Sequence, residues 1–177
     1  MENFPQAQQV RCFANTDSHG DPAPGYVCVV VKSSGSDDKD VRWQLCRTIR
    51  EYLLQRCDCL LAASGRLDVR PSIDMAVNVN ITIVPRDPSK LVSTQQEITD
   101  TLKYIIEEKW ARRGIGDQIR ISEMYSEISR IPNVAGISKL LIEGVYYSEG
   151  NRFVIPVEND SVHEFITVTN GEHKIRI

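Results

Sequence analysis

The chain has 177 residues, 41% of them hydrophobic and 25% charged, with a net charge of -3 at neutral pH. This length suits one domain or two small ones, and the slightly acidic balance gives no reason to expect nucleic acid or an anionic membrane as a partner. No apolar run reaches the roughly 20 residues of a spanning helix, and residues 1–9 lack the features of a signal peptide, so we expect a cytoplasmic protein.

Residues 1–87 are predicted to form a first α+β module. A short strand at 10–14 leads into a loop at 15–25 that is dense in turn-forming residues, and a Val-rich strand follows at 26–32. A stripe of apolar residues at helical spacing predicts a helix over 38–56, with Ser36 or Asp37 as its cap.

The last part of this module is a segment in which every odd position from Leu67 to Ile83 is apolar or Pro. A period of two is typical of extended chain with one buried face, but an ordinary strand has only about 3–10 residues. Pro71 lacks an N–H group and fits a bend or an edge. We therefore predict strands at 67–69 and 73–84, and the unbroken phase predicts that both face one core.

Residues 88–145 are predicted to form a second module, with helices at 94–112 and 123–131 and a strand at 134–145. Ser93 and Gln96 match a capping box, and Ser122 is a candidate cap for the next helix. Gly114 suits the end of the first helix, and Pro132 prevents continuation of the second.

Residues 146–177 are predicted to form a C-terminal β region. A turn over 148–151 joins two extended stretches, and Asn170-Gly171 is a strong hairpin signal. The fold class is therefore α+β: two small strand-helix-strand modules sharing a long central strand, with a C-terminal β-hairpin region.

The sequence offers no arrangement typical of catalysis, a metal or a cofactor, so we expect no enzyme and no small-molecule substrate. Five irregularly spaced cysteines suit a reducing compartment. Cys57 and Cys59 are the only close couple, and zinc requires four ligands. The three histidines fall in predicted loops or at the tail, where we interpret them as surface residues.

Several phrases of the chain, in a fixed order, resemble the baseplate J-like proteins of contractile phage tails and related injection machines. The matching phrases are Gly25-Tyr-Val-Cys-Val-Val-Val31, Arg50-Glu-Tyr-Leu53, Val77-Asn-Val-Asn-Ile-Thr-Ile83, the helix Ile98 to Trp110, and Ile119 to Ile128 leading into Ile131-Pro-Asn-Val-Ala-Gly-Ile137. Members of that family are longer, so the resemblance implies their central and C-terminal part, either as a truncated chain or as a compact variant. The stretch from Cys57 to Ser64 departs from the family's turn.

The resemblance implies a structural wedge subunit that assembles into the baseplate ring through protein–protein contacts. Its partners would be other wedge subunits and copies of itself, and it would be cytoplasmic during assembly and then part of the particle. Two alternatives stay open. One is a stand-alone adaptor that binds a peptide or protein at a sheet edge; the other is a small enzyme with Cys57 or Cys59 as its nucleophile.

For the contact surface, the sequence singles out Tyr146, Tyr147 and Phe153. They flank a predicted turn, and aromatic residues are enriched at interface anchors. The opposing interpretation is that these rings close one end of the core, because aromatic side chains bury large areas in either role.

Overall fold

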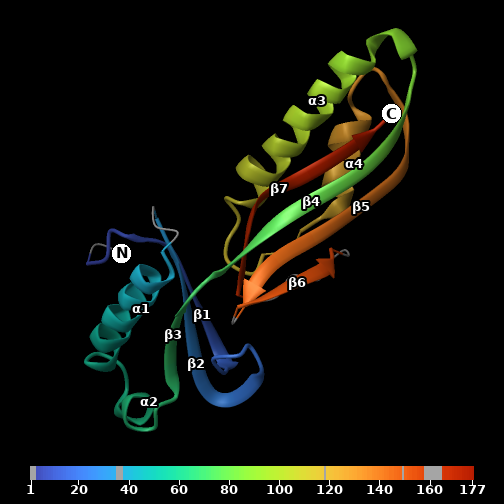
Figure 1. Cartoon of the computed structure of the whole chain (residues 1–177). Helices are drawn as coiled ribbons and strands as arrows, with labels where there is room; N and C mark the ends of the chain where they lie inside the picture. Colours follow the sequence, from blue (N-terminus) through green and yellow to red (C-terminus); the bar gives the residue numbers. More distant parts are fainter. Residues whose placement is uncertain (1–2, 35–37, 118, 149, 158–164) are drawn as a thin grey trace. The chain divides into compact units, whose positions relative to one another are not determined.

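The computed structural model describes residues 3–34, 38–117, 119–148, 150–157 and 165–177 (Figure 1). The chain divides into two compact units, Met1–Ser72 and Ile73–Ile177. Both combine strands with helices, which confirms the α+β class. The division falls between Ser72 and Ile73 rather than after residue 87, because strand pairing changes partners at that point.

The first unit is a three-stranded sheet with one long helix. Strands β1 (Ala7–Thr16) and β2 (Pro22–Ser33) are antiparallel, and β3 (Leu67–Pro71) pairs in parallel with β2, in the order β1-β2-β3. Helix α1 (Lys39–Leu54) and the short α2 (Cys59–Ala63) connect β2 to β3. The core of this unit is formed by one set of small and aliphatic side chains: Ala7, Val29, Val31, Cys46, Ile49, Leu67 and Val69.

Local signals set the ends of these elements. The Asp38 carboxylate accepts a hydrogen bond from the N–H of Asp40 and so caps α1, whereas the predicted caps Ser36 and Asp37 lie outside the described residues. The predicted loop at 15–25 is shorter in the structure, because β2 begins at Pro22. Asn15, at φ 56°, lies at a register shift near the end of β1, and its side-chain oxygen accepts from the N–H of Gly25.

The alternating segment forms two strands as predicted, β3 and β4 (Ile73–Pro85). The expectation that both face one core is wrong. Leu67 and Val69 pack in the first unit, whereas the odd positions from Met75 to Ile83 pack in the second. The change follows from hydrogen bonding: the N–H of Ser72 donates to Val31 of β2, and the N–H of Ile73 donates to Phe165 of the second unit.

The second unit is a four-stranded mixed sheet in the order β6-β5-β4-β7, with its helices on one face (Figure 1). Strand β5 (Val134–Ser148) is antiparallel to both β4 and β6 (Asn151–Pro156), and β7 (Ile166–Arg176) is parallel to β4. The helical elements are the short turn η1 (Pro88–Lys90), α3 (Leu91–Lys103), the π-helical η2 (Tyr104–Trp110) and α4 (Ile121–Ser129).

Two predicted helix starts are wrong, although both helices exist. Helix α3 begins at Leu91, and the Ser93 hydroxyl donates to the carbonyl of Lys90 instead of capping the helix. Asp87 caps the preceding turn, where its side chain accepts from the N–H of Ser89. Helix α4 begins at Ile121, so Ser122 lies inside its first turn.

The hairpin predicted at Asn170-Gly171 is also wrong, because both residues lie within the continuous strand β7. The pairing of β7 with β4 shifts there: Val77 lies opposite Asn170, but Val79 lies opposite His173. The extra residue is a bulge, and the Asn78 side-chain oxygen accepts from the N–H of Glu172 at 2.8 Å. Thus residues 146–177 supply strands to the same sheet as β4.

Candidate protein-interaction surface

The three aromatic residues singled out from the sequence lie on the antiparallel ribbon of β5 and β6. Tyr146 lies opposite Phe153, and Tyr147 lies opposite Arg152. The rings of Tyr146 and Phe153 are stacked, with centroids 5.2 Å apart and planes 13° from parallel. Offset-stacked rings at this separation attract each other beyond their burial, so this pair helps to hold β6 onto β5.

The two faces of this ribbon have different surroundings. Tyr146 is partly buried and packs against the hydrophobic core beneath the helices. Tyr147 points to the opposite face, because side chains alternate along a strand, and it is 67% exposed. The structure therefore places Tyr146 at the edge of the core and leaves Tyr147 accessible.

An aliphatic neighbour that the sequence did not single out completes the accessible surface. Val154 is 46% exposed and pairs with Val145, on the same face of the ribbon as Tyr147. Only strand register could have revealed it, since Val154 has no aromatic or turn signal of its own. We call the surface formed by Tyr147 and Val154 the ribbon surface. Phe153, which is 41% exposed, lies on the other face of the ribbon, opposite Tyr146.

Strand edges are the second type of candidate surface. In the described part of the chain, β1 and β3 each pair on one side only, and so do β6 and β7. Open edges are templates for strand addition. The adaptor hypothesis therefore keeps a structural basis.

A network of ion pairs joins η2 to α4 on the helical side. The Arg113 guanidinium donates to both carboxylate oxygens of Glu123 at 2.7 Å, and the Trp110 indole N–H donates to the same carboxylate at 3.2 Å. One turn away, the Lys109 ammonium lies 2.6 Å from the Glu127 carboxylate. Lys109 and Arg113 are thus partners of α4 as well as complements of the helix dipole, whereas Arg112 pairs with Glu108 on its own helix.

These contacts make the network sensitive to acid. Burial is the largest single influence on Glu123 and opposes its ionisation, but the hydrogen bonds from Arg113 and Trp110 outweigh it, so its pKa is lowered. The hydrogen bond from Lys109 likewise lowers the pKa of Glu127. A carboxylate whose folded-state pKa is depressed contributes stability above its ordinary pKa, and the contribution is lost as the pH falls through the folded value.

We therefore expect acid to loosen η2 from α4 in a way that depends on Glu123. The stabilisation is complete above pH 4.5, the ordinary glutamate value, and decreases below it. Urea midpoints measured between about pH 7 and about pH 3 should fall less steeply for Glu123→Gln than for the native chain. Equal pH slopes for the two proteins would contradict this assignment.

Two of the five cysteines, Cys28 and Cys46, are buried in the first unit. Burial raises the pKa of both Cys28 and Cys46 to about 12, so these thiols stay protonated. Cys57 is partly buried, with its sulfur 3.9 Å from the carbonyl of Leu54, and Cys59 is exposed at the start of α2. No hydrogen bond from a histidine reaches either of these two thiols within the described residues.

One histidine departs from the surface interpretation. His173 lies in β7 and is half-buried, which lowers its pKa. Its Nε2 atom is 2.9 Å from the side-chain oxygen of Asn170, whose amide in turn donates to Glu107. His19 is in the turn between β1 and β2 as expected, and His163 lies outside the described residues.

No group of three or more His, Cys, Asp or Glu side chains in the described part of the chain is placed to hold a metal ion. No helix among the same residues has the length and apolar character needed to cross a bilayer.

Comparison with known proteins shows a likeness of fold. No protein-family profile and no curated protein sequence matches the chain. Among solved structures, the fold is similar to a chain in the "Cryo-EM structure of the anti-feeding prophage (AFP) baseplate, 6-fold symmetrised", with a TM-score of 0.54 and 13% identity. The likeness covers 98% of this chain and 35% of that one, so the chain spans about a third of the length of the protein it resembles.

Proposed function

We propose that this chain is a structural subunit of the baseplate of a contractile injection system, working through protein–protein contacts. The observation that carries the proposal is the structural likeness to a baseplate chain, which extends over both units and 98% of the sequence. The order of sequence phrases points to the same class of protein without using the structure. Within the baseplate we assign the chain to the wedge, with other wedge subunits and copies of itself as partners.

The ribbon surface is the contact that we propose for the partner subunit. A closed ring requires two different complementary surfaces on each subunit, and exposed aromatic and aliphatic side chains are typical interface anchors. Tyr147 and Val154 are exposed on one face of a ribbon whose other face is tied to the core through Tyr146. The stacked rings of Tyr146 and Phe153 tie β6 to β5, and a contact surface that is ordered before binding lowers the entropic cost of binding.

The test is a pull-down in which the chain is the bait and the other baseplate proteins of the same gene cluster are the prey. The native chain is compared with the double variant Tyr147→Ser/Val154→Ser, called the ribbon variant. We expect at least about tenfold weaker binding with an unchanged melting temperature. The matched control is Tyr104→Ser/Val92→Ser, which removes exposed side chains of the same types, 53% and 84% exposed, from the helical side.

Tyr146→Ser provides the internal comparison, because its ring packs against the core and its loss should lower the melting temperature. If the ribbon variant and the control variant weaken partner binding equally, the proposed contact is contradicted. Failure of every baseplate protein to bind the native chain would contradict the function itself.

The second candidate function, an adaptor that pairs with an added strand, is favoured by β1. This strand has 10 residues, lies at an edge of its sheet within the described residues, and leaves Val10 44% exposed. Replacing Val10 by Pro removes a backbone N–H and blocks pairing. Partner binding that is lost in Val10→Pro but retained in the ribbon variant would favour the adaptor.

A further inference from the structure

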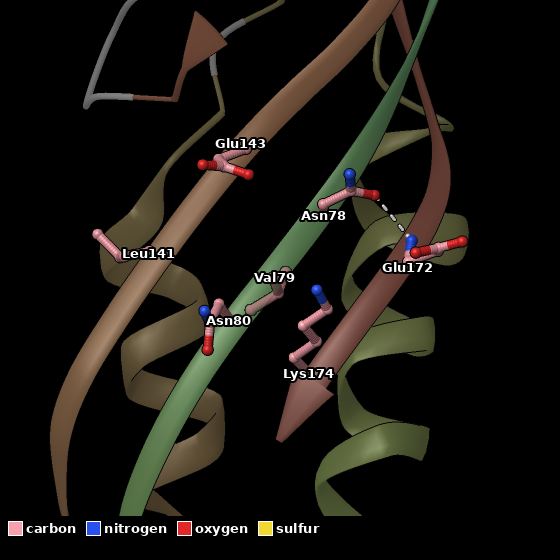
Figure 2. A pocket seen from close by; sticks show the side chains of 7 residues that line it. All are labelled: Asn78, Val79, Asn80, Leu141, Glu143, Glu172 and Lys174. Atoms are coloured by element: carbon pink, nitrogen blue, oxygen red, sulfur yellow. Dashed lines mark hydrogen bonds between the residues drawn. The ribbon is translucent and has the colours of Figure 1, made fainter. Parts of the chain in front are cut away.

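The face of the second unit's sheet that the helices leave uncovered has an unusual distribution of charge. Side chains on this face come from the even positions of β4 and from their partners on β5 and β7. The centre is small and neutral, with Asn78, Asn80 and Thr82 of β4. Long side chains on the flanking strands border a shallow hollow of about 100 Å³ along β4 (Figure 2).

The register sorts the charges by sign along the strands. Glu143 of β5 lies opposite Asn78, and Glu172 of β7 bonds the same asparagine through its N–H. Farther along β4, Thr82 pairs with Lys139 on one side and Arg176 on the other. One end of the face is therefore acidic and the other basic, whereas the surfaces of soluble proteins usually intersperse the two signs.

None of these four charged side chains has an ion-pair partner among the described residues, and all four are exposed. Their charges are therefore available to a partner. A partner that fits must present the reverse order, basic opposite the acidic end and acidic opposite the basic end. Complementary charge of this kind fixes the orientation of two surfaces as they meet.

We propose that this uncovered face binds a second copy of the chain about a two-fold axis. The axis would run across the strands at the level of Asn80, so that the two β4 strands cross antiparallel, in the aligned packing of a β-sandwich. In this arrangement each strand lies over the same strand of the second copy, and the two run in opposite directions. An isologous contact of this type needs only one self-complementary surface.

The register shows why the fit is favourable. About that axis, Glu143 faces Lys139 of the second copy and Glu172 faces its Arg176, and symmetry repeats each pair. Leu141, 45% exposed, faces its own counterpart, and Ala76 faces the exposed Val84. Lys174 also faces its counterpart, but it lies on the edge strand, where solvent and salt screen the repulsion.

This inference rests on the proposed function, which supplies the expectation that copies of the chain contact one another. It places the contact between copies on a surface other than the ribbon surface. In the register, Tyr147 lies beyond the row of Ala76, which is the last row of the two-fold contact on this side. Val154 lies in that row, but on the outer strand β6 and not on the strands β4, β5 and β7 that carry the facing residues. The ribbon surface thus stays free for a different subunit, and the two contacts can be tested separately.

The experiment is sedimentation equilibrium of the full chain alone. A polar contact on one face of a four-stranded sheet should give a reversible dimer with a Kd on the order of micromolar. The dimer should weaken when the salt concentration rises from about 0.05 M to about 0.5 M, because salt screens the ion pairs. Lys139→Glu should raise the Kd at least about tenfold, because it sets like charges against each other. The double variant Lys139→Glu/Glu143→Lys exchanges the signs and should restore dimerisation.

Glu97→Lys, which reverses an exposed charge on α3, is the matched control and should leave the Kd unchanged. Melting temperatures of all variants verify that they fold. A native chain that stays monomeric at about 1 mM, or a dimer that Lys139→Glu leaves intact, would overturn the proposal. Neither result would bear on the pull-down of baseplate proteins, so failure of the dimer and failure of the proposed function remain distinguishable.

Discussion

Gly171→Ala is expected to destabilise the second unit by about 2 kcal/mol or more, because the new methyl group has no space. A Cβ at this position would lie 2.7 Å from the backbone carbonyl oxygen of Val77 and would also collide with the side-chain oxygen of Asn78. A flexible side chain can move away, but the backbone of the central strand β4 cannot. The substitution should therefore force β7 away from β4 at its bulge.

Urea denaturation in a Trp43→Phe background measures this effect, since the remaining Trp110 is 2% exposed in the core of the second unit. Gly136→Ala is the matched control, because a Cβ there meets nothing within 4 Å. It should be neutral or slightly stabilising. A Gly171→Ala protein as stable as the Gly136→Ala protein would mean that β7 does not approach β4 as closely as described.

The second large effect is expected for Ile81→Ala, at about 2–5 kcal/mol. Ile81 lies in the middle of β4, has no exposed surface, and belongs to the hydrophobic core beneath the helices. Truncation there loses the transfer free energy of the side chain and leaves a cavity that a four-stranded sheet with packed helices closes poorly.

The same denaturation measurement on Thr82→Ala provides the comparison. Thr82 is the next residue of β4 and points to the uncovered face, so its truncation should change stability by about 0.5 kcal/mol or less. Similar losses for the two variants would show that β4 does not have one buried and one uncovered face.

Much of the secondary structure was predictable because it depends on neighbours in the sequence. The period of two between Leu67 and Ile83, interrupted at Pro71, located β3 and β4. Apolar stripes at helical spacing located α1 and α4 to within a few residues. The single helix predicted at 94–112 covers both α3 and the π-helical η2. These patterns reflect which side of an element is buried, which the residues themselves determine.

What could not be predicted depends on partners distant in the chain. Whether β3 and β4 share a sheet is decided by hydrogen bonds to β2 and β7, and periodicity carries no information about them. Asn170-Gly171 suits a tight turn locally, but pairing with β4 stabilises a bulge instead. Ser93 does not act as a cap, because the helical segment already starts at the turn that Asp87 caps. The N–H of Asp87 donates to the side-chain oxygen of Asn133 at 2.8 Å, a contact distant in the sequence.

The candidate surfaces show the same limit. Aromatic character was enough to find Tyr146, Tyr147 and Phe153, but only the register separates the core-facing Tyr146 from the exposed Tyr147. Val154 and the sorted charges of Lys139, Glu143, Glu172 and Arg176 gave no signal, because their arrangement arises only when β5 and β7 flank β4. Whether these surfaces bind partners remains a proposal.

The central claim is that the chain is a component of a baseplate. The most direct measurement is cryo-EM, with mass spectrometry, of contractile particles purified from the organism that encodes the chain. We expect the chain in those particles, with density for both units in the baseplate and with the ribbon surface against another subunit. Particles with complete baseplates that lack the chain would contradict the account.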